Sequence, residues 1–195
     1  MAYFERIWSS SASEARPEHF GLRRDFLLGH VSAGTRVLDL GCGLGDFAAA
    51  LVEHGAQAIG CDVAEEALRR ARARHLGIEF VRSGEELPFA DGSFDAAWAG
   101  EVLEHVQDVL GLLAEVHRVL RPQGRLIVST PDHGPAKRLH LGLSRRAFET
   151  TFDPRSDHVR YFTKSTLRTA LARSEFSELD VASRRGLLLA TAKAN

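Results

Sequence analysis

Residues 37–45 read Val-Leu-Asp-Leu-Gly-Cys-Gly-Leu-Gly, an apolar run that passes directly into a glycine-rich turn. The apolar run predicts a buried strand, and glycines at alternate positions allow positive φ and let a ligand approach the backbone closely. A helix beginning near Asp46 would then offer free N–H groups to the same ligand. Asp39 is unusual, because a carboxylate buried in a strand is costly without a partner. We therefore expect Asp39 to serve a ligand or the adjacent loop.

Outward from this turn, strand and helix patterns alternate, which is typical of a parallel sheet covered on both faces. The last two strands are joined by too few residues for a crossover helix, so we expect them to form an antiparallel hairpin. The prediction is an α/β fold with a mixed sheet. The expected helices lie near 45–54, 64–74, 107–120 and 163–174, and the expected strands near 36–40, 57–61, 78–81, 94–98, 125–130, 177–183 and 187–193.

The length of 195 residues fits one domain. Residues 1–35 are expected to form an N-terminal helical segment, of which residues 1–16 are either an ordered flap or a frayed end. The stretch 131–162 is long, mixed in charge and rich in aromatic residues and histidine. A connection of this length predicts a lid or binding loop.

The composition favours small molecules as partners. A formal net charge of −1 gives no electrostatic reason to expect binding to nucleic acid or membranes, and no apolar run is long enough to span a bilayer. The first residues lack the apolar stretch of a signal peptide. We expect a cytoplasmic protein whose two cysteines, Cys42 and Cys61, are free. The sequence does not indicate the oligomeric state.

A second carboxylate, Asp62, ends the second predicted strand, 62 − 39 = 23 residues after Asp39. In open α/β sheets, ligands bind beyond the carboxyl ends of the strands, and an acidic residue there can accept both hydroxyls of a ribose. The alternative is that Asp62 only caps the helix beginning near Ala64.

These features resemble the class I S-adenosylmethionine-dependent methyltransferases, in particular the group of ubiquinone-biosynthesis-like and other small-molecule methyltransferases. The resemblance implies a Rossmann-like, doubly wound, seven-stranded mixed sheet with the last strand antiparallel and helices on both faces. The motifs that carry it are Val37–Gly45, Asp62, Leu87–Asp95, Glu101–Val106 followed by Arg118–Gly124, and His158–Thr163.

The resemblance also implies S-adenosylmethionine as cofactor and S-adenosylhomocysteine as product. It places Asp39 at the glycine loop or at the amino group of the cofactor, Asp62 at the ribose, and the three glycines near the methionine part. Gly100 and Glu101 are expected to line the passage between cofactor and acceptor. The full set of expected cofactor residues is Asp39, Gly41, Cys42, Gly43, Gly45, Asp62, Val63, Ser83, Gly84, Glu85, Gly100 and Glu101.

Two positions depart from the family pattern. The family commonly places an acidic residue after the third strand for the adenine amino group, and here that position is Ser83, followed by Gly84 and Glu85. We expect the Ser83 hydroxyl or Glu85 to take this role. Glu175 stands where the family usually has glycine, at the end of the last crossover helix, which concerns helix termination and not chemistry.

A sulfonium methyl group is already electrophilic, so catalysis needs in-line positioning of the acceptor and, for some acceptors, a base. His105 is the first candidate for this base, because an unperturbed histidine pKa of about 6.5 suits proton removal near neutral pH. The alternative is that its ring only hydrogen-bonds the neighbouring backbone. His158 and His133 are further candidates. Glu101, Glu104 and His105 alone make a weak metal motif, and we expect no metal.

The predicted function is therefore transfer of a methyl group to an oxygen atom of a small molecule, with nitrogen or carbon as alternative acceptor atoms. A nicotinamide-dependent oxidoreductase is a second alternative, because Gly43–Ala48 fits the G-x-G-x-x-A pattern with Asp62 downstream. That reading leaves Asp39 and the motif Leu87–Asp95 unexplained. A noncatalytic module that binds S-adenosylmethionine is a third alternative.

Overall fold

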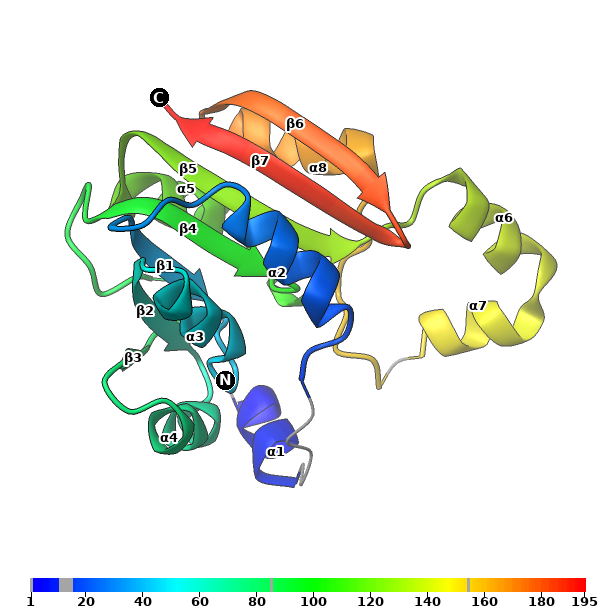
Figure 1. Cartoon of the computed structure of the whole chain (residues 1–195). Helices are drawn as coiled ribbons and strands as arrows, with labels where there is room; N and C mark the ends of the chain where they lie inside the picture. The colour runs from blue at the N-terminus through cyan, green and yellow to red at the C-terminus, as the bar shows by residue number, and fades with distance from the viewer. Residues whose placement is uncertain (1, 11–15, 85, 154) are drawn as a thin grey trace.

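The computed structural model describes residues 2–10, 16–84, 86–153 and 155–195. Figure 1 shows a single sheet with helices on both of its faces. The strands are β1 Arg36–Leu40, β2 Gln57–Asp62, β3 Glu79–Arg82, β4 Phe94–Gly100, β5 Leu120–Pro131, β6 Phe176–Arg184 and β7 Leu187–Ala194. The helices are α1 Ala2–Ser10, α2 Phe20–Leu28, α3 Asp46–Glu53, α4 Glu65–Arg74, the 3₁₀ helix η1 Leu103–His105, α5 Val109–Val119, α6 Pro135–Leu143, α7 Arg145–Thr151 and α8 Lys164–Arg173.

The sheet has seven strands in the order β3-β2-β1-β4-β5-β7-β6. Strands β1 to β5 pair in parallel, and β7 runs antiparallel to both β5 and β6. The predicted mixed sheet with an antiparallel last strand is therefore confirmed. β1 lies between β2 and β4, so the strand order reverses beside it. Ligands of doubly wound sheets bind at this point, beyond the carboxyl ends of the strands.

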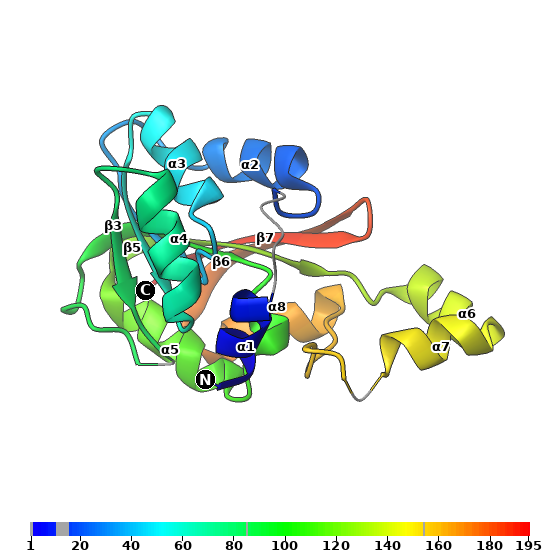
Figure 2. The ribbon, with the colours of Figure 1, turned by 90° about the horizontal axis from the view of Figure 1, so that it is seen from below.

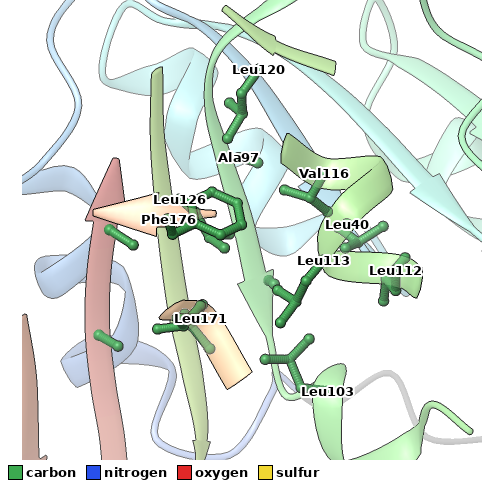
Figure 3. Packing of buried hydrophobic residues seen from close by; sticks show 14 of the residues in the cluster. Leu40, Ala97, Leu103, Leu112, Leu113, Val116, Leu120, Leu126, Leu171 and Phe176 are labelled. Carbon is green, nitrogen blue, oxygen red and sulfur yellow. The ribbon is translucent and has the colours of Figure 1, made fainter. Parts of the chain in front are cut away.

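Alternation along each strand divides the core into two layers. Val37 and Trp98 belong to the layer under α2, α3 and α4, whereas Leu38 and Ala97 belong to the layer that α5 and α8 cover. Figure 3 shows the second layer, in which side chains from α5 and Leu171 of α8 point toward the strands. Because successive residues of a strand point to opposite faces, one short apolar strand such as β1 supplies both layers.

The predicted helices between residues 45 and 174 agree with the structure to within two residues at each end. β5 begins five residues earlier than expected and contains a bulge at Gln123, whose φ of 65° coincides with a register shift between β4 and β5. The connection 131–162 contains α6 and α7, which project from the side of the sheet (Figures 1 and 2). None of the helices in the described ranges is long and apolar enough to cross a membrane.

Candidate functional site

A pocket of about 820 Å³ lies beyond the carboxyl ends of β1, β2, β3 and β4. Eight of the residues expected in the site line it: Gly41, Gly43, Asp62, Val63, Ser83, Gly84, Glu101 and His105. The other lining residues lie outside the expected sets of cofactor and base residues: Phe4, Ile7, Trp8, Leu40, Cys61, Glu86, Val102, Val106, Leu112 and Asp157. Asp39, Cys42, Gly45 and Gly100 lie near the pocket without lining it, and Glu85 falls outside the described residues.

The glycine turn between β1 and α3 presents bare backbone to the pocket. Gly41, Gly43 and Gly45 all have positive φ, between 52° and 79°, a region that side chains disfavour. A Cβ on Gly41 would lie 2.5 Å from Val102, and a Cβ on Gly45 would lie 2.7 Å from the Phe80 ring. Gly45 is therefore needed for packing between the turn and β3, whereas Gly41 and Gly43 form the pocket wall.

Asp62 ties the glycine turn to the start of α4. One carboxylate oxygen accepts a hydrogen bond from the amide of Gly43 at 2.9 Å, and the other accepts from the amide of Ala64 at 2.9 Å. Burial raises the pKa of Asp62, and these amides oppose the shift. Each oxygen retains a further lone pair, so the carboxylate can hold the turn and still accept hydroxyl groups from the pocket.

Asp39 lies near the end of β1, just before the glycine turn, and is only 1% exposed. The amide of Ala48, in the first turn of α3, donates to its carboxylate, while burial raises its pKa to about 7. Oδ2 of Asp39 has no hydrogen-bond partner. A buried oxygen without a partner is costly, and a cationic group in the neighbouring pocket would lower that cost.

Helix α1 closes one side of the pocket with Phe4, Ile7 and Trp8. The Glu5 carboxylate accepts hydrogen bonds from the amides of Glu65 and Glu66 at 2.9 and 3.2 Å, which are unsatisfied donors in the first turn of α4. The carbonyl of Trp8 accepts from Arg70 at 2.9 Å. Within the described residues 2–10, α1 therefore packs on α4 beside the pocket, whereas α6 and α7 contribute no lining residue.

Ser83 and Gly84 lie after β3, where the family pattern places its adenine contact. The Ser83 hydroxyl lies 2.9 Å from the carbonyl of Glu86, to which it donates, so its proton is used within the turn. Its oxygen lone pairs can still accept a hydrogen bond from an amino group. Because serine stands where the family pattern has an acidic residue, this end of the pocket carries a neutral hydrogen-bond acceptor.

A buried network positions Glu101 at the opposite end of the pocket. Arg23 is 3% exposed and donates to the hydroxyl of Ser129 at 3.0 Å, and that hydroxyl donates to Glu101 at 3.1 Å. The Arg23 guanidinium lies 4.8 Å from the centre of the Phe47 ring. Burial raises the pKa of Glu101, and the charge of Arg23 opposes this shift. No motif in the sequence indicates a role for Arg23, which is one of two adjacent arginines in α2.

The three candidate histidines lie in different settings. His105 lines the pocket, and its Nδ1 lies 3.0 Å from the carbonyl oxygen of Asp157. The rings of His105 and His158 meet edge to face with centroids 4.8 Å apart. His133 does not line the pocket, is 8% exposed and packs on Tyr161. Burial lowers the pKa of both His133 and His158.

Comparisons with known proteins agree with this geometry. A family model described as "Methyltransferase domain" matches residues 38–128. The chain is 30% identical to the ubiquinone biosynthesis O-methyltransferase of Neisseria meningitidis, over 96% of this chain and 84% of that protein. It is 39% identical to the demethylmenaquinone methyltransferase of Beutenbergia cavernae, but over only 55% of this chain and 46% of that protein. The solved structure of an S-adenosylmethionine-dependent methyltransferase from Mesorhizobium loti is 25% identical, with a TM-score of 0.70, and covers 87% of this chain and 95% of that one.

Proposed function

Because the chain belongs to the class I S-adenosylmethionine-dependent methyltransferases, we propose that it transfers a methyl group to an oxygen atom of a small molecule. The observation that carries the choice of oxygen is the similarity, over nearly the whole chain, to a relative named as an O-methyltransferase. We propose a small hydroxylated compound as the acceptor.

The pocket residues fit S-adenosylmethionine in chemistry. Gly41 and Gly43 would leave room for its methionine part, where the buried, unpartnered oxygen of Asp39 supplies negative charge for a cationic amine. Asp62 would accept the ribose hydroxyls through its remaining lone pairs. The adenine end would lie at Ser83 and the residues beside it. The wider proposed cofactor set comprises Cys42, Gly45, Val63, Gly84, Glu85, Gly100 and Glu101.

When bound, S-adenosylmethionine supplies an electrophilic methyl group on a sulfonium. The chain has to hold an acceptor oxygen in line with that methyl group, within about 3 to 3.5 Å, and to accept the proton that the hydroxyl loses. His105 is suited to this, because a carbonyl oxygen can only accept and Nδ1 therefore carries the proton toward Asp157. Nε2 then retains its lone pair for the acceptor. The products are a methyl ether, S-adenosylhomocysteine and a proton on His105.

The two cysteines indicate the cellular compartment. Cys42 and Cys61 are free and buried, and free thiols persist in reducing compartments. We propose a cytoplasmic location on this ground. His158 and His133 lie outside the pocket wall, to which the segment 131–162 contributes Asp157. The expected roles of these histidines and of the segment in acceptor binding and closure remain predictions.

The test is product identification. The purified chain is incubated with S-adenosylmethionine carrying a labelled methyl group and, in separate reactions, with a phenol, an aromatic amine and a compound with an acidic C–H group. Label recovered in a methyl ether, together with S-adenosylhomocysteine, supports the proposal. Label found only on nitrogen or carbon refutes the choice of oxygen. Absence of methyl transfer, together with hydride transfer in parallel reactions supplied with NAD, would refute the whole assignment. Asp180→Asn changes an exposed carboxylate. As the control variant, it should give the same labelled product as the wild type.

A further inference from the structure

Three potential metal ligands gather beside the acceptor end of the pocket: Glu104, His105 and His158. Each offers one ligand atom, and these atoms all lie within 4.8 Å of one another. Two of the residues are adjacent in η1, but His158 comes from the segment that follows α7. Only the fold brings this third donor to the other two.

Backbone hydrogen bonds hold the two segments together. The carbonyl oxygen of Glu104 accepts from the amides of Val159 and Arg160, at 2.9 and 3.1 Å. These bonds fix the residue directly before them, His158, against η1, and its ring packs edge to face on that of His105. The cluster is therefore built by main-chain contacts and not by chance approach of long side chains.

One carboxylate oxygen of Glu104 has no hydrogen-bond partner. The residue is 1% exposed. Oε2 accepts a hydrogen bond from Thr130 at 2.9 Å, whereas Oε1 has no hydrogen-bond partner. A buried carboxylate in this condition is costly unless it is paired or bound to a metal, and a cation would supply the missing partner.

His105 is oriented as a metal ligand. Its Nδ1 faces the carbonyl oxygen of Asp157 at 3.0 Å, which leaves Nε2 as the unprotonated nitrogen. Histidines that bind metals almost always donate their other ring N–H to a carbonyl or carboxylate in this way, which fixes the ring and its tautomer.

We propose that Glu104, His105 and His158 bind one divalent transition-metal ion, such as Zn²⁺. One carboxylate and two imidazoles form a donor set used by catalytic zinc sites, which keep an open coordination position. His105 lines the pocket, so the open position would face the acceptor.

A metal there would change how the acceptor hydroxyl is activated. This consequence rests on the proposed methyl transfer, whereas ion binding itself does not. A metal-bound hydroxyl would release its proton to water at lower pH than a free hydroxyl, so His105 would act as a ligand and not as the base. One ring nitrogen cannot do both, and metal titration distinguishes the two roles. The expectation from the sequence, that the chain binds no metal, would then be wrong because it considered Glu101 in place of His158.

The test uses the full chain, freed of metal with a chelator, and needs neither S-adenosylmethionine nor an acceptor. Co²⁺ is titrated in and followed by its visible absorption, and Zn²⁺ binding is measured by calorimetry. Glu104→Gln and His158→Gln remove one ligand each. His140→Gln, at an exposed histidine of α6, is the matched control. We expect one ion per chain, affinity weakened at least about tenfold in both ligand variants, and no change in the control.

Absence of ion uptake by the wild-type chain would overturn the proposal, as would uptake that persists unchanged in both ligand variants. His158 is only half-buried, so His158→Gln keeps the test decisive even where Glu104→Gln disturbs folding. Because the readout is ion binding alone, its failure would leave the proposed O-methylation standing with His105 as base. Failure of methyl transfer would equally leave the ion site standing.

Discussion

Replacing Asp39 by asparagine is expected to stabilise the free protein while weakening its hold on the cofactor. Burial raises the pKa of this carboxyl from 3.8 to about 7, so the folded chain binds the proton more tightly than the unfolded chain. Each pKa unit corresponds to about 1.36 kcal/mol, and a shift of roughly three units therefore costs the folded wild type about 4 kcal/mol above pH 7. Asparagine, which is neutral and similar in shape, avoids this cost.

The direction of the pKa shift determines how the stability difference between wild type and variant varies with pH. Below pH 4 the carboxyl is protonated in both states, and the wild type loses no stability through it. As pH rises from 4 to 7, the unfolded chain releases the proton first and the stability of the wild type falls relative to Asp39→Asn. Urea unfolding at pH 5, 6, 7 and 8 should show the difference in free energy of unfolding growing by up to about 1.4 kcal/mol per pH unit, and levelling off above pH 7.

Asp180→Asn, at an exposed carboxylate, is the control and should show no such profile. A stability difference for Asp39→Asn that does not vary with pH would refute the reasoning, as would a variant less stable than the wild type at pH 8. S-adenosylmethionine affinity, measured on the same samples, is expected to fall, because the variant lacks the negative charge that we propose for the cationic amine of the cofactor.

Three further changes test other parts of the account. Asp62→Ala should weaken S-adenosylmethionine binding roughly 100-fold, since hydrogen bonds to a charged group contribute about 1.5 to 3 kcal/mol; equilibrium binding at wild-type strength would remove Asp62 from the site. His105→Gln should lower turnover at least about 100-fold and leave cofactor affinity unchanged, and a steady-state assay with equal kcat would return His105 to a purely structural role. Glu175→Gly should raise the free energy of unfolding by about 1 kcal/mol, because Glu175 has a φ of 63°, a backbone conformation that costs non-glycine residues about that much. Thermal melting measures the change. Glu53→Gly in α3 is the control and should destabilise the protein.

Much of the fold was predictable because it depends on local patterns. The apolar run before Gly41 and the stripe of α5 each specify an element and the face that it buries. The short link between β6 and β7 leaves no topology other than a hairpin. β5 was harder, because the bulge at Gln123 depends on pairing with β4 and not on local propensity.

The pocket wall at the glycine turn was also within reach of the sequence, because it depends on main-chain shape at Gly41 and Gly43 and on one carboxylate at a strand end. The acceptor side was not. Trp8 reaches the pocket only because Glu5 caps α4, a contact between residues 60 positions apart. Arg23 and His158 likewise acquire their neighbours through packing of distant segments, for which a single sequence carries no local signal.

The central claim is that the pocket at the glycine turn binds S-adenosylmethionine, and calorimetric titration of the purified chain tests it most directly. S-adenosylmethionine, S-adenosylhomocysteine and NAD are titrated in parallel into the wild type and Asp62→Ala. The account predicts that the first two bind the wild type at micromolar strength, that NAD does not bind, and that the variant loses both ligands. Binding of NAD alone, or binding of S-adenosylmethionine that Asp62→Ala leaves intact, would contradict it.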